Sequence, residues 1–90
     1  LPPTFVLQES VRCPWEEKGR IMREITREAH NHGTVELIDG IKISNDEGWG
    51  LVLPDASEPY FHVYAEGDNE SMAQETLDKY VHRIEQLRGA

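Results

Sequence analysis

The apolar positions of this 90-residue chain recur at two spacings, one typical of helices and one typical of strands. Helical spacing predicts a helix over residues 15–30, with an apolar stripe formed by Ile21, Met22, Ile25 and Ala29. It predicts a second helix near the end of the chain, with a stripe formed by Ala73, Leu77, Tyr80, Val81, Ile84 and Leu87. Runs of β-branched and aromatic residues predict strands over residues 4–12, 35–38, 41–44, 49–53 and 60–65.

Each predicted helix has a single apolar stripe and therefore one face to bury. Two such helices are accommodated when both cover one face of an antiparallel sheet. The pattern thus predicts an α+β fold with about four strands and two helices on one face of the sheet. No repeat, low-complexity tract or linker divides the sequence, so we expect residues 1–90 to form a single domain.

Several local signals set the expected ends of these elements. Pro14 lies where the first helix would begin, and Gly33 is a favourable stop beyond its end. Ser71 and Gln74 have the spacing of a capping box for the last helix. Asp39-Gly40 fits either a tight hairpin or a bend within one strand, so the strand count stays open at that point. Glu9 interrupts the apolar phase of the first strand, which indicates an edge strand or a bulge.

Strand periodicity divides the side chains of the two central strands between two faces. Trp49, Leu51 and Leu53 share one face of their strand. In the next strand Phe61, Val63 and Ala65 share one face, and Tyr60, His62 and Tyr64 share the other. Trp49 and Tyr64 could form a sugar-stacking surface, although aromatic residues in strands more often pack in a core or against a cross-strand partner.

The charge of the chain excludes several classes of partner. A net charge of −8 and an isoelectric point near 4.8 argue against nucleic acid and against anionic membrane surfaces. No apolar run is long enough for a transmembrane helix. Cys13 is the single cysteine, so no internal disulfide can form, and this fits a reducing, cytoplasmic location. The start at Leu1 suggests a piece of a longer chain.

Most other polar residues favour structural roles. His30 and His32 are two positions apart and point to different helix faces, so a zinc pair is not expected. Glu16, Glu17 and Lys18 are expected to form a charged, exposed first turn. We therefore assign no catalytic residue and no metal ligand within this chain.

The segment from Pro54 to Pro59 is the best candidate for a functional site. Both prolines lack a backbone donor and have a restricted φ, which predicts a rigid, exposed loop between paired strands. Asp55, Ser57 and Glu58, with the backbone amides, could bind a polar ligand or a cation, or supply an acid/base pair of carboxylates. The alternative is a solvated turn in which Asp55 and Ser57 hydrogen-bond to local amides.

The same region resembles the C-terminal domain of the phosphohexomutases, the phosphoglucomutase and phosphomannomutase superfamily. The family segment is roughly Gly-Trp-x-Leu-Val-Arg-Pro-Ser-Gly-Thr-Glu-Pro-x-x-Arg-x-Tyr-x-Glu. The matching residues here are Gly48, Trp49, Leu51, Val52, Pro54, Glu58, Pro59, Tyr64 and Glu66. The run Asp39-Gly40-Ile41-Lys42 and the segment from Cys13 to Arg20 extend the resemblance over nearly the whole chain. It implies a fold of the TATA-binding-protein type, a curved antiparallel sheet with two helices.

The resemblance also implies a role for the loop. In this family the matching loop binds the phosphate of a phosphosugar, while the phosphoserine and the magnesium site lie on other domains. It implies that Asp55, Ala56, Ser57, Glu58, Pro59 and His62 are the substrate phosphate-binding positions. The expected partners are a phosphosugar and the other domains of the parent chain. No cofactor is expected in this domain, and magnesium is expected elsewhere in the parent.

The phosphate-binding positions depart from the family pattern. Leu53 and His62 replace two arginines, and Asp55 replaces a serine. The loss of two charge-assisted hydrogen bonds would cost about 3–6 kcal/mol, and Asp55 would repel a phosphate. His62 could compensate only when it is protonated. The leading hypothesis is a phosphate loop of reduced strength; the rival is a non-catalytic packing or regulatory module, as in mannose-1-phosphate guanylyltransferase-type fusions whose loops resemble this one.

Overall fold

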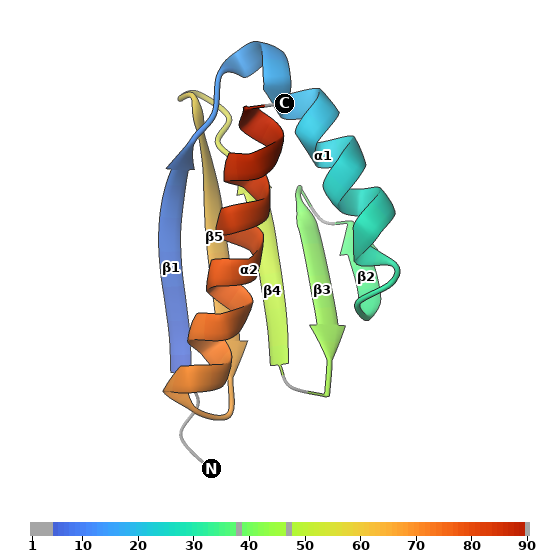
Figure 1. The fold of residues 1–90 in the computed structure, drawn as a ribbon, viewed down its shortest axis with the longest axis vertical. Coiled ribbons are helices and arrows are strands. Elements are labelled where there is room, and N and C mark those ends of the chain that lie inside the picture. Colours follow the sequence, from blue (N-terminus) through green and yellow to red (C-terminus); the bar gives the residue numbers. More distant parts are fainter. Residues whose placement is uncertain (1–4, 38, 47, 90) are drawn as a thin grey trace.

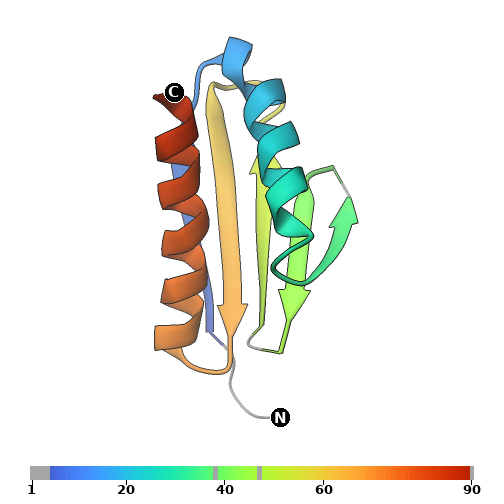
Figure 2. The same ribbon diagram turned by 45° about the vertical axis from the view of Figure 1, so that its right-hand side comes forward.

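The computed structural model describes residues 5–37, 39–46 and 48–89. The elements in chain order are β1 (Phe5–Arg12), α1 (Trp15–Ala29), β2 (Thr34–Leu37), β3 (Ile41–Asn45), β4 (Gly48–Pro54), β5 (Tyr60–Gly67) and α2 (Glu70–Arg88). The strands form one antiparallel sheet in the order β1-β5-β4-β3-β2. Both helices cover the same face of this sheet (Figures 1 and 2). The predicted α+β fold is therefore confirmed.

The sheet has five strands, close to the expected four, because Asp39-Gly40 lies in a hairpin turn between β2 and β3. Asp39 has a φ of +56°, a conformation that Asp adopts more readily than most residues. Gly40 is buried, and a Cβ there would lie 2.4 Å from the carbonyl oxygen of Val52. The turn thus needs an unusual φ at one position and a missing side chain at the next.

β1 is an edge strand and its pairing with β5 is unbroken, from Phe5 opposite Gly67 to Arg12 opposite Tyr60. The interruption of its apolar phase at Glu9 therefore reflects the edge position, not a bulge. Thr4 and Ile38, which the sequence placed in strands, lie outside the described residues, as does Glu47.

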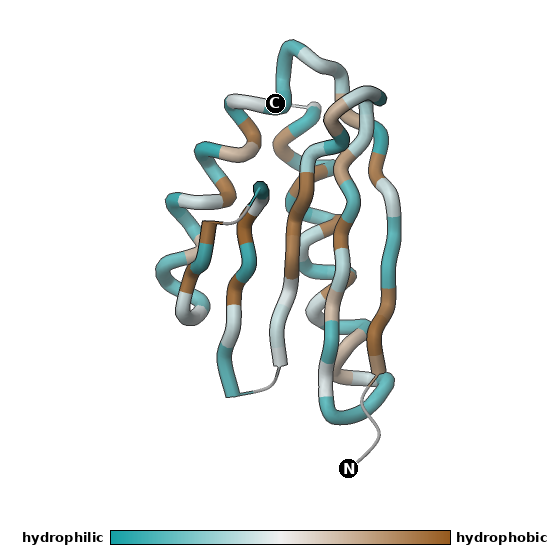
Figure 3. Tube along the Cα trace, turned by 180° about the vertical axis from the view of Figure 1, so that it is seen from behind, coloured by the Kyte–Doolittle hydropathy of each residue, from teal (hydrophilic) through white to brown (hydrophobic). Residues whose placement is uncertain are grey.

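The core lies between the sheet and the two helices. It includes the helix stripes predicted from the sequence and the Phe61, Val63 and Ala65 face of β5. In β4 the core-facing residues are Gly50 and Val52, so Trp49, Leu51 and Leu53 lie on the opposite face and are half-buried. Seen from that opposite side, hydrophobic and hydrophilic residues alternate along the strands (Figure 3). One face of the sheet thus carries the core, and the other is mixed.

The helix ends differ from two expectations. Asn69, not Ser71, is the N-cap of α2, and its side chain accepts a hydrogen bond from the amide of Met72, so the predicted capping box is wrong. α1 ends at Ala29, before Gly33 can act as its stop. Gly33 instead allows a close approach to β3, since a Cβ there would lie 2.2 Å from the carbonyl oxygen of Ser44. At α2 one local cap thus replaces another, whereas at Gly33 packing against β3 decides the role of the residue.

Candidate functional site

The loop that joins β4 to β5 is folded around the side chain of Asp55. One carboxylate oxygen, Oδ1, accepts hydrogen bonds from the backbone amides of Ser57 and Glu58, both at 2.8 Å. The base of the loop is closed by the amide of Asp55, which donates to the carbonyl of Tyr60 at 2.9 Å. The structure therefore has the turn that the sequence offered as an alternative, in which Asp55 binds local amides.

The second carboxylate oxygen of Asp55 binds a histidine from the neighbouring strand. Oδ2 lies 2.7 Å from Nε2 of His62, and Nδ1 of His62 lies 2.9 Å from the hydroxyl of Ser10 on β1. The hydrogen bond to His62, followed by those from the two loop amides, lowers the pKa of the Asp55 carboxyl to about 2. At neutral pH the loop therefore contains a fully ionised carboxylate with both oxygens engaged.

Lys18 of α1 binds the backbone of the β4–β5 loop. Its ammonium group donates to the carbonyl oxygens of Asp55 at 2.7 Å and Glu58 at 2.6 Å, and it lies over the ring of Trp15 at 3.9 Å from the centroid. Lys18 is only 6% exposed. The expectation of an exposed first turn is wrong for this residue, because the loop carbonyls provide the polar partners that make its burial possible.

A second anchor joins the start of α1 to the end of the loop. The amide of Cys13 donates to the carbonyl of Pro59 at 2.8 Å. Burial, followed by the nearby Glu17 carboxylate, raises the pKa of the Cys13 thiol, which suits a structural residue and not a nucleophile. The β4–β5 loop is thus fixed at both of its ends and in its middle.

The structure brings the six predicted site residues into one small region, but it gives them different roles. Asp55 and His62 bind each other, and Pro59 is half-buried beside Cys13. Ala56, Ser57 and Glu58 form the exposed crest of the loop. Ala56 does not need a glycine conformation, since Asp39 is the one described non-glycine residue with positive φ.

Lys18 is the site residue that sequence reasoning missed. It lies three positions before Ile21 and seven before Ile25, which places it in line with the buried stripe of α1. A lysine in line with an apolar stripe is the signal that could have identified it. That signal was masked by the two acidic neighbours, Glu16 and Glu17.

The aromatic residues of the mixed face have cross-strand partners. Nε1 of Trp49 donates to a carboxylate oxygen of Glu66 at 2.5 Å, and the ammonium group of Lys42 lies 5.0 Å from the centroid of the Trp49 ring. Glu66 is directly opposite Trp49 in the β4–β5 pairing, and Tyr64 is opposite Leu51. The cross-strand alternative for Trp49 is therefore confirmed.

The described residues contain no group of three or more histidine, cysteine or acidic side chains suited to hold a metal ion. Within the same residues, no helix is both long and apolar enough to cross a bilayer.

Comparison with known proteins places this geometry in context. No family model matches the chain. Over 82 residues, 90% of its length, the chain is 34% identical to a probable phosphoglucosamine mutase of Methanopyrus kandleri. It is 36% identical over 75 residues, 81% of its length, to the phosphoglucosamine mutase of Methanococcus aeolicus. It is 30% identical over 91 residues, 98% of its length, to that of Methanocaldococcus jannaschii.

This chain is homologous to a part of phosphoglucosamine mutases. It spans 18%, 17% and 20% of the lengths of these three relatives, in the order given. The relatives support the phosphohexomutase resemblance that the loop motif indicated. An origin in a nucleotidyltransferase fusion stays a prediction.

Proposed function

We propose that this chain is the C-terminal domain of a phosphohexomutase-like protein that acts in phosphosugar conversion. In this proposal the β4–β5 loop lies at the phosphate end of the substrate, and phosphoryl transfer takes place on other domains, which also hold magnesium. The names of the relatives make a glucosamine phosphate the first substrate to test. A cytoplasmic location is part of the same proposal, since the single cysteine is free.

One observation carries the proposal: the amides of Ser57 and Glu58 converge on a single anionic oxygen. Two backbone donors at 2.8 Å from one oxygen are the arrangement that a loop uses to hold a phosphate oxygen. Lys18 fixes the loop backbone through two carbonyls, so the amides keep their direction without a ligand. The loop therefore has the geometry of an anion site.

In this chain the anion in that site is the carboxylate of Asp55. A phosphate must displace this carboxylate or bind beside it, and at close range two like charges repel by about 1–4 kcal/mol. His62, which stands at the position of a family arginine, is already bound to Asp55. We therefore expect weak phosphosugar binding by the isolated domain. The dissociation constant should lie in the millimolar range or above, which corresponds to a binding free energy of about −4 kcal/mol or weaker.

The binding of the Asp55 carboxylate to the loop amides also favours a second candidate function, a non-catalytic packing or regulatory module. If Asp55 never leaves the loop amides, the loop is a self-contained structural unit and the domain contributes only contacts to the parent protein. A nucleotidyltransferase fusion is one such parent. The two candidates differ in whether removal of the Asp55 carboxylate produces a phosphate site.

An amide-resolved NMR titration separates the candidates. Glucosamine 6-phosphate, glucose 6-phosphate and mannose 1-phosphate are added to the wild-type chain and to Asp55→Ser, which carries the serine found in the family motif. Asp68→Ser is the matched control, since Asp68 is an exposed acid outside the loop and its removal changes the net charge equally.

We expect weak, saturable shifts confined to residues 55–62 in the wild-type chain. Asp55→Ser should bind about tenfold or more tightly, because repulsion is removed and the two amides are released. Asp68→Ser should behave like the wild-type chain. Flat spectra at millimolar ligand for both the wild-type chain and Asp55→Ser would contradict the phosphosugar role and support the packing module.

A further inference from the structure

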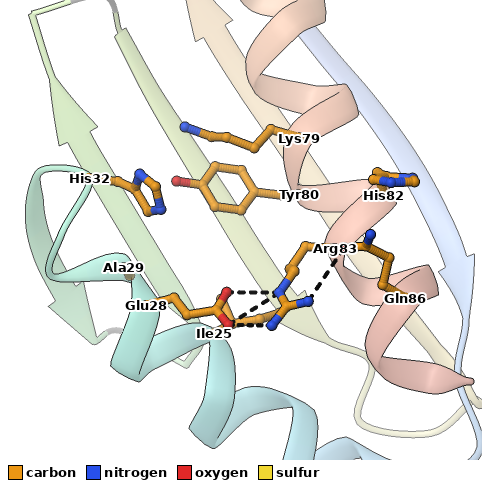
Figure 4. A pocket seen from close by; sticks show the side chains of 9 residues that line it. All are labelled: Ile25, Glu28, Ala29, His32, Lys79, Tyr80, His82, Arg83 and Gln86. Atoms are coloured by element: carbon orange, nitrogen blue, oxygen red, sulfur yellow. Dashed lines mark hydrogen bonds and ion pairs between the residues drawn. The ribbon is translucent and has the colours of Figure 1, made fainter. Parts of the chain in front are cut away.

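A cleft of about 250 Å³ lies between α1 and α2, and it shares no residue with the β4–β5 loop. Its apolar part is formed by Ile25 and Ala29 of α1 and by the ring of Tyr80 of α2. His32, Lys79 and Arg83 contribute polar groups to its lining (Figure 4). The two helices diverge toward this region (Figures 1 and 2).

Tyr80 lines this cleft with its ring and its hydroxyl (Figure 4). The residue is 5% exposed, and its ring packs on β4, where a Cβ at Gly50 would lie 2.8 Å from Cε2 of Tyr80. The Tyr80 hydroxyl makes no hydrogen bond to the described residues, and it is open to solvent at the cleft, since none of their buried polar side-chain atoms lacks a partner. Burial raises the pKa of Tyr80 to about 12, so the hydroxyl is protonated and can donate at any physiological pH.

Two cationic or potentially cationic side chains lie at the same end of the cleft. The hydroxyl of Tyr80 points toward the ring of His32, and the amino group of Lys79 lies 5.0 Å from the centroid of the Tyr80 ring (Figure 4). Neither Lys79 nor His32 has a carboxylate partner among the residues that the structure describes, although the chain carries 17 acidic residues. The Tyr80 hydroxyl and the Lys79 ammonium group are therefore two donors that have no carboxylate partner among the described residues at this end of the cleft.

The carboxylate that lines the cleft is already ion-paired. Glu28, which also lines the cleft, binds the guanidinium of Arg83 through both of its oxygens, including a hydrogen bond of 2.9 Å from Nε. This pair closes the other side of the cleft (Figure 4). An anion that enters beside Tyr80 therefore meets donors and an apolar wall, not an unpaired acid.

We propose that the cleft between α1 and α2 binds a small organic oxyanion with an apolar body. The oxyanion accepts hydrogen bonds from the Tyr80 hydroxyl and the Lys79 ammonium group, with His32 beside them. The apolar body lies against Ile25, Ala29 and the Tyr80 ring. A volume of about 250 Å³ suits a molecule smaller than a typical drug. This site is independent of the phosphosugar loop and holds whether or not that loop binds phosphate.

The test uses benzoate as the probe, with benzamide as a neutral molecule of the same shape and phenyl phosphate to distinguish carboxylate from phosphate. Binding to the wild-type chain is followed by amide-resolved NMR. Tyr80→Phe removes only the hydroxyl and keeps the ring that packs on Gly50. Lys79→Met removes one exposed charge, and Arg23→Met is its matched control, because Arg23 is an exposed residue of α1 that does not line the cleft.

We expect benzoate or phenyl phosphate to give saturable shifts in the cleft residues, with benzamide about tenfold weaker or more. Tyr80→Phe and Lys79→Met should each weaken binding about fivefold to tenfold, and Arg23→Met should leave it unchanged. Equal binding of benzoate and benzamide would overturn the proposal, as would no saturable shift with either anion. Shifts that appear in the β4–β5 loop instead of the cleft would also overturn it.

Discussion

Lys18→Met tests how strongly a buried ammonium group supports the β4–β5 loop. Lys18 is 6% exposed and donates to two loop carbonyls at 2.7 and 2.6 Å. Each hydrogen bond to a charged group contributes about 1.5–3 kcal/mol, so their loss costs about 3–6 kcal/mol. Methionine fills a similar volume without the desolvation cost of a buried charge, which offsets part of this loss. We expect a net destabilisation of about 2–4 kcal/mol.

This amount is a large part of the free energy of unfolding, since a chain of this length is typically stable by about 5–13 kcal/mol. Urea denaturation followed by circular dichroism measures it: the midpoint should fall while the slope with denaturant stays constant. Arg23→Met, which removes an exposed charge from the same helix, should change the stability by less than about 0.5 kcal/mol. A loss below about 1 kcal/mol for Lys18→Met would refute the argument, because the loop carbonyls would then be equally well satisfied by water.

Three further predictions follow from the loop, the α2 cap and the packing of β4. The pKa of the Asp55 carboxyl is held at about 2, below its usual 3.8, so its contribution to stability is present above pH 3.8 and is lost as the pH falls toward 2. In an acid titration, Asp55→Asn should therefore lose less stability than the wild-type chain over this pH range. Equal losses in the two proteins would contradict the proposed hydrogen bonds of Asp55. Asn69→Ala should lower the free energy of unfolding by about 1 kcal/mol in thermal or urea unfolding, whereas Ser71→Ala should have little effect. A larger loss for Ser71→Ala would instead indicate that Ser71 is the N-cap. Gly50→Ala should cost about 1–3 kcal/mol, since its Cβ would lie 2.8 Å from the Tyr80 ring, and a stable variant with unchanged Tyr80 resonances would contradict this contact.

The anion bound by the amides of the β4–β5 loop is the carboxylate of Asp55, a residue of the same loop. The sequence shows that Asp55 replaces a family serine, and from this alone a repulsive charge would be expected at the phosphate site. The structure shows that the carboxylate is bound by two amides and by His62. Under the proposed phosphosugar role, phosphate affinity would be lowered by occupation of the loop amides as well as by repulsion, and only the folded loop distinguishes these two causes.

The sequence by itself determined the helices, most of the strands and the α+β class. These features depend on the spacing of apolar residues within one element, and the spacing is visible without knowledge of the partners. The predicted stripe of α2 is confirmed in full, since all six of its residues are buried in the structure. The loop between the two prolines was equally local, since proline restricts its own φ, but Pro54 itself is the last residue of β4, opposite Phe61, and was wrongly placed in the loop.

Only the tertiary structure decided the roles of residues whose partners are far away in the chain. The burial of Lys18 depends on carbonyls 37 and 40 positions later, and the position of His62 depends on Ser10 of the edge strand. The missing side chain at Gly50 matters because the Tyr80 ring of α2 lies against it. A polar group can be buried, and a cleft can form, only where separate elements meet, and that meeting is not encoded in any single stretch of the sequence.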